Sequence, residues 1–397
     1  MTGVNRPQTI IAAVAFAVAG VSFFMAMPVV VGAWSMEAGI GAERAGYLAT
    51  AEGGGGVLAS LLVSALIHRI NWRVMALLGI VIAVGANLLS TFIDAFYVLG
   101  VARSLAGFGC GILYALGLGI LAGTRNTGRN FSILLFVQVS YGMFAINLLP
   151  YLIDAIGIAG IYFAIATATL GCTALIPWVP RAADALGLSQ SLSTDVPQAG
   201  STDADSDPAL PNASILPWLC LLAVFLFSLT TSSFWAYIEL VGRNGGLAAS
   251  FLTASLTYTQ MVSLLGCVAA GWFSIRYGLA RPLLLSLAGS VLATLSLVIE
   301  FSPASFVLAL SAFFFFWNTA DIYQLSTLGL MDKAGQYVAL APAFQMTASA
   351  LGPGLAGWLL ATSGSLSTAL VLASACTCGA ILIHFYITLR QRVTATG

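Results

Sequence analysis

Long apolar runs, separated by short charged or glycine-, proline- and asparagine-rich breaks, dominate this 397-residue sequence. A helix needs about 20 consecutive apolar residues to cross the hydrocarbon core of a bilayer, and each run has about that length. Water-soluble domains carry about 25% charged residues, whereas this chain is 7% charged and 59% hydrophobic. The sequence therefore predicts an all-α membrane protein with about twelve spans. These are residues 9–33, 45–67, 73–92, 95–122, 130–153, 157–178, 215–239, 248–274, 282–300, 303–330, 336–362 and 366–389.

The one long polar stretch of the sequence lies between the sixth and seventh runs. Residues 181–214 are rich in Ser, Asp, Ala and Pro, and such low hydrophobicity predicts a flexible linker. The expected domains are therefore an N-terminal six-helix bundle over residues 1–180 and a C-terminal six-helix bundle over residues 215–397, joined by this linker.

Lys and Arg beside the spans favour one orientation, because cytoplasmic loops are enriched in both residues. An N-terminus inside the cell leaves only Arg44 and Arg243 outside and Arg103 within a span. We expect an integral protein of the cytoplasmic (inner) membrane with both termini and the linker on the cytoplasmic side. The residues then placed inside are Arg6, Arg69, Arg73, Arg125, Arg129, Arg181, Arg276, Arg281, Lys333, Arg390 and Arg392.

Several kinds of chemistry have no motif in the sequence. The six cysteines lie in apolar runs, which is typical of reduced core residues, and the two histidines, His68 and His384, lie near helix ends. Neither a phosphate-binding loop, a zinc-protease motif nor a Ser/His/Asp arrangement is present. We therefore predict no enzyme activity, no ATP-driven pump, no metal and no cofactor. The balance of 14 basic and 14 acidic residues gives no sign of nucleic-acid binding, and we expect a monomer.

Two loops and one span carry a family resemblance. The loops at residues 64–73 and 271–281, and the fourth span with Arg103 followed by Gly107, Gly109 and Gly111, resemble motifs of the major facilitator superfamily (MFS). The resemblance implies twelve transmembrane helices in two pseudo-symmetric bundles and a secondary transporter that binds a small-molecule solute in the lipid bilayer.

The loop motif departs from the family pattern in ways that bear on gating. The family's loop aspartate is replaced by His68 in the first copy and by Ile275 in the second, and two glycines of the first copy are Ser64 and Asn71. A lock built on that aspartate is then weaker or differently built. The basic residues that remain are either gating residues or topology anchors; they are Arg69, Arg276 and Arg281.

Three ionisable residues lie deep inside apolar runs, where charges are costly unless they face a partner or a wet cavity. Arg103 is expected to bind a solute carboxylate or to take part in proton coupling; the alternative is a structural arginine held by backbone carbonyls or by Glu52. Asp321 is the leading candidate for a proton carrier, with a hydrogen-bonded structural acid as the alternative. Glu52 is either a second proton carrier or, somewhat more in keeping with its position, a packed acid.

The resemblance implies that spans one, four, seven and ten line the central path. Aromatic and weakly polar residues there, with some from spans five and eleven, are the expected substrate-binding residues. They are Arg103, Tyr114, Tyr141, Trp235, Tyr237, Trp317, Asn318, Tyr323, Gln324 and Gln345. The resemblance also implies a sliding seam between the glycine-rich segments 53–56 and 352–357 of spans two and eleven.

This lining favours a small amphipathic or aromatic organic solute, for example a monocarboxylate, because sugars and phosphates generally need more polar groups or more cations. The leading hypothesis is proton-coupled symport by alternating access. The alternative is a proton antiporter that exports hydrophobic drugs or metabolites, although the fifth span lacks the Gly-Pro motif typical of such exporters. A sensor or assembly partner without transport activity is a third, weaker alternative.

Overall fold

The computed structural model describes residues 3–67, 69–180, 215–299, 301–332 and 336–396, and this described part of the chain is helical without strands. Together with the apolar spans, it confirms the predicted all-α fold of two six-helix bundles. The linker prediction for residues 181–214, and the placement of His68 and Lys333, lie outside the described residues.

The first half of the chain forms one set of packed helices, which we call the N-terminal bundle. Helix α5 is at its centre and packs against α1, α3 and α4. Its elements are η1 (Gly3–Asn5), α1 (Pro7–Gly20), α2 (Ser22–Met36), α3 (Ala42–Leu66), α4 (Trp72–Ser90), α5 (Phe96–Ala122), α6 (Thr127–Ile156), α7 (Ala159–Gly171) and η2 (Cys172–Trp178).

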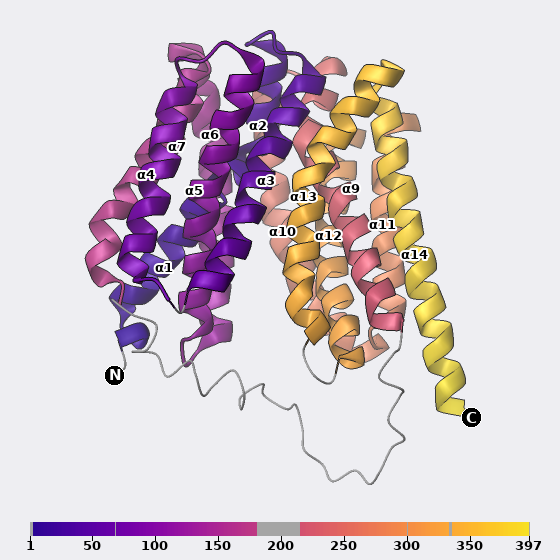
Figure 1. The fold of residues 1–397 in the computed structure, drawn as a ribbon. Helices are drawn as coiled ribbons and strands as arrows, with labels where there is room; N and C mark the ends of the chain where they lie inside the picture. The colour runs from indigo at the N-terminus through magenta and orange to yellow at the C-terminus, as the bar shows by residue number, and fades with distance from the viewer. Residues whose placement is uncertain (1–2, 68, 181–214, 300, 333–335, 397) are drawn as a thin grey trace.

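The second half forms the C-terminal bundle, in which α12 packs against α10 and α11 while α9 packs against α13 and α14. Its helices are α9 (Leu216–Asn244), α10 (Ala249–Tyr277), α11 (Ala280–Ile299), α12 (Pro303–Met331), α13 (Gln336–Ser363) and α14 (Leu366–Thr396). The two bundles stand side by side, and the start of α1 and the end of α14 lie at the same end of the molecule (Figure 1). We call this the proximal end and the opposite one the distal end.

Eleven helical segments among the described residues are long and apolar enough to cross a membrane. The predicted eleventh span, α13, is not among them, although it is 28 residues long and runs beside the others. It contains Pro342 and Pro353 and several small or polar residues. It packs against α3 and α9, so it contacts protein along much of its length.

The first span is broken rather than continuous. Helix α1 ends at Gly20 and α2 begins at Ser22, with Val21 between them outside the helical region (φ −105°, ψ 8°). A Cβ on Gly20 would overlap the carbonyl oxygen of Cys110 and the backbone of Tyr114. The break therefore lies where the first span presses closely against α5.

The bundles are joined mainly through α3 with α13, α2 with α9 and α6 with α10. Small residues allow the closest approach: a Cβ on Gly53 would lie 2.8 Å from Cα of Ala350, and the backbone N–H of Gly354 donates to Thr50 Oγ1 at 2.8 Å. Gly55, in contrast, packs against α5 through the carbonyl oxygen of Ser104. The glycine-rich segment of α3 thus serves two different contacts.

Candidate functional site

Arg103 and Glu52 form a buried ion pair inside the N-terminal bundle. Arg103 Nη2 lies 2.7 Å from Glu52 Oε1 and Nε lies 3.0 Å from Oε2, the two-bond geometry that suits a guanidinium and a carboxylate. Arg103 is 0% exposed and Glu52 is 3% exposed. The pair lies on α5 and α3, in the half of the bundle nearer the distal end.

Two polar residues of α4 complete the surroundings of Arg103. Its Nη1 donates to Asn87 Oδ1 at 3.0 Å and to Ser90 Oγ at 3.3 Å. Asn87 and Ser90 are both buried, and neither is among the site residues predicted from the sequence. Their spacing of three residues in an apolar run, on one face of a helix, was the available signal.

Aromatic rings and close backbone packing seal this pair. The Arg103 guanidinium lies 5.0 Å from the centre of the Tyr162 ring and 6.0 Å from that of Trp34, and Trp34 Nε1 donates to the Tyr162 hydroxyl at 2.8 Å. A Cβ on Gly107 would overlap the backbone carbonyl of Glu52. In this conformation Arg103 is therefore held by Glu52. This contact is the one expected if Arg103 is a structural arginine rather than a solute-binding residue.

Asp321 has a different environment, on α12 of the C-terminal bundle. It is partly exposed, and its Oδ2 accepts a hydrogen bond from Trp317 Nε1 at 2.9 Å. Among the residues that the structure describes, no Lys, Arg or His lies within ion-pair distance of it. Within the described ranges, the carboxyl group thus lies deep in the bundle without a compensating cation.

The helix face that carries Asp321 leads toward the contact between the bundles. Phe314, Asn318 and Asp321 are spaced as i, i+4 and i+7 and so share one face of α12. The Phe314 ring meets Trp235 edge-on at 5.2 Å, and Trp235 Nε1 donates to the Phe24 carbonyl of the other bundle at 2.8 Å. Asn318 donates to Ser263 Oγ on α10 at 2.8 Å.

Two other candidates on α12 point into the bundle. Tyr323 is 0% exposed and its hydroxyl donates to the Ala270 carbonyl of α10 at 2.8 Å. Gln324 is also fully buried, and neither polar atom of its side chain has a hydrogen-bond partner among the described residues. In this conformation both side chains are therefore buried in helix packing.

The remaining candidates from spans four, five and eleven are partly buried. Tyr114 of α5 lies within hydrogen-bonding reach of Gln138 on α6, and Tyr141 of α6 lies within reach of Ser22, just after the break in the first span. Gln345 is partly buried on α13. Tyr114 and Tyr141 therefore connect the broken span, α5 and α6 at mid-depth.

The distal end is closed by polar contacts between the bundles. Tyr237 of α9 is 2% exposed and its hydroxyl donates to the Ala42 carbonyl of α3 at 2.7 Å. Arg243 of α9 lies 2.7 Å from Glu239 on its own helix and 3.7 Å from Glu37 at the end of α2. The sequence predicted an outer position for Arg243 without a role for it.

The candidate gating arginines lie at the proximal end. Arg69 follows α3, Arg276 is in the last turn of α10 and Arg281 is in the first turn of α11; all three are exposed. The Arg276 guanidinium also lies 5.8 Å from the Trp272 ring centre. The polar contacts between bundles described above lie at mid-depth or toward the distal end, so none of them involves these three arginines.

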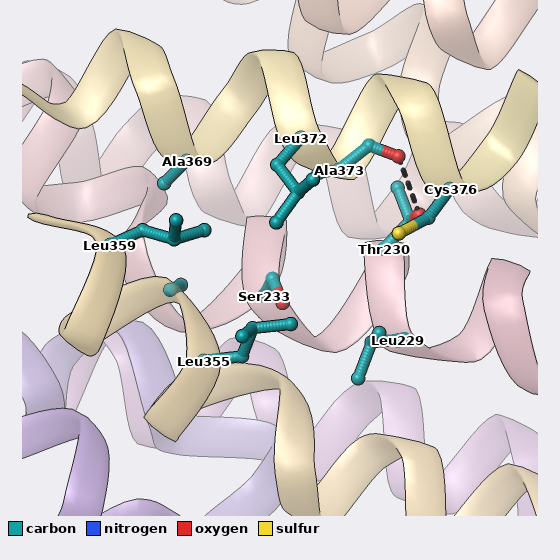
Figure 2. Close-up of a pocket in the computed structure, with 10 residues that line it drawn as sticks. Leu229, Thr230, Ser233, Leu355, Leu359, Ala369, Leu372, Ala373 and Cys376 are labelled. Atoms are coloured by element: carbon teal, nitrogen blue, oxygen red, sulfur yellow. Dashed lines mark hydrogen bonds between the residues drawn. The ribbon is translucent and has the colours of Figure 1, made fainter.

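Two hydroxyl groups of α9 pack against neighbouring helices. Thr230 donates to the Ala373 carbonyl of α14 at 2.7 Å, and Ser233 donates to the Gly352 carbonyl of α13 at 2.9 Å. Figure 2 shows both beside a void between α9, α13 and α14 with a volume of about 10 Å³. A void of this size holds about one water molecule, so it is too small for an organic solute.

The fold and this arrangement define a class of polytopic helical membrane proteins with two bundles that meet toward one end. A family model described as Major Facilitator Superfamily matches residues 12–332, and the chain therefore belongs to this superfamily, which confirms the resemblance. It is an integral membrane protein and a secondary transporter of small-molecule solutes rather than an enzyme. A comparison with curated protein sequences finds no match.

Proposed function

We propose that this transporter is a proton-coupled symporter of a small amphipathic or aromatic organic solute, for example a monocarboxylate, with Asp321 as the proton carrier. The observation that carries the proposal is the environment of Asp321: a partly exposed carboxyl group deep in α12 whose described hydrogen bond comes from one indole N–H. Ionisable groups at such depth mark proton and substrate pathways in membrane proteins.

Glu52 is a weaker candidate for the proton because Arg103 occupies both of its oxygens. A protonated Glu52 would leave a guanidinium buried beside a neutral partner, and an uncompensated buried charge is strongly destabilising. Asp321 has no such partner among the described residues. We infer that Arg103 and Glu52 fix the geometry of the N-terminal bundle while Asp321 changes its charge during transport.

The solute site proposed here lies on the proximal side of the contact between Trp235 and Phe24. Trp235, Phe314 and Trp317 form an aromatic cluster in the C-terminal bundle, in which Trp235 and Phe314 are buried and Trp317 is partly exposed. Tyr141 of α6 is partly exposed. A Cβ on Gly142 would lie 3.6 Å from both Met25 and Gln260 Nε2, so polar and apolar groups of both bundles meet here. Such a wall suits an amphipathic or aromatic solute.

In alternating access, a transporter opens its central site to one side of the membrane at a time, so the observed conformation corresponds to one state of the transport cycle. With the proximal end on the cytoplasmic side, as the distribution of Lys and Arg favours, the distal contacts of Tyr237, Trp235 and Arg243 close the outer side. We propose that the molecule is then in an inward-facing state. Rocking of the bundles about the mid-depth site would break these contacts and form new ones at the proximal end, near Arg69, Arg276 and Arg281.

Uptake into proteoliposomes tests the proposal. Purified protein is reconstituted, and accumulation of radiolabelled benzoate, 3-phenylpropionate and decanoate is measured with and without an inward proton gradient. Protein-free vesicles correct for passive permeation of the undissociated acids. A symporter accumulates a solute above the protein-free level only with the gradient. Uptake indifferent to the gradient contradicts the proposal, and gradient-driven loss of preloaded solute indicates the antiporter.

A further inference from the structure

A second cavity lies at the proximal end of the N-terminal bundle, between α1 and the start of α6. Its volume is about 720 Å³, within the range of small-molecule sites. It lies far along the helices from Asp321 and Trp235 of the other bundle. None of the residues assigned above to proton coupling or solute binding lines it.

The wall of this cavity is apolar along α1 and, beyond Asn130, along α6. On α1 the lining residues Pro7, Ile10, Ile11 and Val14 follow a spacing of i, i+3, i+4 and i+7, which places them on one face. Ile11 is 54% exposed and Ile133 of α6 is 37% exposed. Each helix thus turns an incompletely covered aliphatic stripe toward the cavity.

The mouth of the cavity is basic. Arg125 and Arg129 line it and are exposed, and neither forms an ion pair with a carboxylate among the described residues. Helix α6 begins at Thr127 without a side-chain cap. The positive end of its dipole lies at this N-terminus, next to Arg125 and Arg129. Guanidinium groups in such a position suit the two oxygens of a carboxylate or phosphate.

The cavity is polar at its mouth, near Arg125 and Arg129, and apolar further along α6, near Ile133 and Val137. Val137 also lines the cavity and lies eight residues beyond Arg129 along α6, which is about 12 Å at 1.5 Å per residue. A ligand that places an anionic group between Arg125 and Arg129 can therefore lay an apolar chain along Ile133 and Val137. We propose that this cavity is a binding site for an anionic amphiphile, with the head group held by Arg125 and Arg129.

This site is separate from the proposed solute site, and the proposal holds whether or not transport is coupled to protons. Two sources share its chemistry: a free amphipathic acid, and an anionic lipid of the surrounding membrane. Basic residues at the membrane surface attract both kinds of head group.

The test measures binding to the purified full-length protein after delipidation in a neutral detergent. Radiolabelled decanoate is the probe, and phosphatidylglycerol is the competitor, with phosphatidylcholine as its uncharged control. We expect saturable binding that is weakened about tenfold or more in the R125Q/R129Q double variant, because charge-assisted hydrogen bonds are lost. The matched control is R6Q: Arg6 is exposed just before α1 but does not line the cavity.

A second variant tests the apolar part without a change of charge. Ile133→Trp should fill the cavity and weaken decanoate binding, while the thermal unfolding of the protein, measured in parallel, stays near that of the wild type. Competition by phosphatidylglycerol but not phosphatidylcholine supports the site with a lipid as its occupant, and binding without such competition supports it with a free acid. Absence of saturable binding, or equal affinity in the wild type and the R125Q/R129Q variant, overturns the proposal.

Discussion

Arg103 donates two hydrogen bonds to Glu52, at 2.7 and 3.0 Å, from a site where neither residue is more than 3% exposed. The pair joins α5 to α3, and Asn87 and Ser90 extend it to α4. Three helices of one bundle thus share a single buried cation. Asp321 of the other bundle has no such partner among the described residues, and this contrast is the basis for assigning different roles to the two sites.

Removal of one member of the Arg103–Glu52 pair should destabilise the protein. Glu52→Gln leaves the guanidinium without its counter-charge, and loss of one partner of a buried pair costs about 3–5 kcal/mol. Unfolding in mixed micelles measures the loss. The double variant Glu52→Gln/Arg103→Met, which removes both charges, should recover a substantial part. A double variant no more stable than Glu52→Gln would contradict this account.

Neighbouring glycines of α3 should differ sharply when replaced by alanine. A Cβ on Gly55 would overlap the Ser104 carbonyl, whereas a Cβ on Gly54 meets no atom within 4 Å. Gly55→Ala should therefore lower the unfolding temperature, since α3 and α5 must separate. Gly54→Ala should leave it unchanged or raise it slightly, because alanine favours a helix by about 1 kcal/mol over glycine. Equal effects of the two substitutions would count against the described packing.

Loss of the Tyr237 hydroxyl should favour opening of the distal end. Tyr237→Phe removes the hydrogen bond to the Ala42 carbonyl across the bundles, and one such bond contributes about 1 kcal/mol, or a several-fold change in population. Spin labels at the exposed positions Ala38 and Ala248, in a cysteine-free background, report the distance between the bundles.

Tyr323→Phe is the matched control for this measurement, because the Tyr323 hydroxyl bonds to Ala270 within its own bundle. The distance distribution should shift to longer values in Tyr237→Phe and remain at its wild-type value in Tyr323→Phe. An unchanged distribution in both variants contradicts a closing role for Tyr237.

The two carboxylates beside Arg243 should contribute unequally. Glu239 is 4% exposed and lies 2.7 Å from Arg243, whereas Glu37 is exposed and lies 3.7 Å away. Exposed ion pairs contribute about 0–1 kcal/mol, so Glu37→Gln should have little effect on unfolding. Glu239→Gln should cost clearly more. A larger loss of stability in Glu37→Gln than in Glu239→Gln would contradict this account. It would show that the Arg243–Glu37 contact between the bundles contributes more to stability than the buried Arg243–Glu239 contact.

The helices could be predicted from the sequence because each apolar run is about as long as a membrane span; α13 is the exception, since it is a long helix but not among the segments apolar enough to cross a membrane. The candidate site could be predicted only in part. The sequence shows that Arg103, Glu52 and Asp321 lie deep inside apolar runs. It also shows Trp317 one helical turn before Asp321, the spacing at which the two side chains form a hydrogen bond. It was insufficient for the break at Val21, which depends on how α1 and α2 pack against α5. The partners Asn87 and Ser90, and the separate contacts of Gly53 and Gly55, also depend on tertiary packing that no local pattern records.

The central claim, that Asp321 carries the coupling proton, is tested most directly by comparing two modes of transport in Asp321→Asn. The amide keeps the size of the side chain and an oxygen that accepts from Trp317, but it does not ionise. Proteoliposomes are assayed for proton-driven accumulation of a solute that the wild type accumulates, and for exchange of that solute across the membrane without a gradient. The account predicts that accumulation is lost while exchange persists; accumulation at the wild-type level in Asp321→Asn would contradict it.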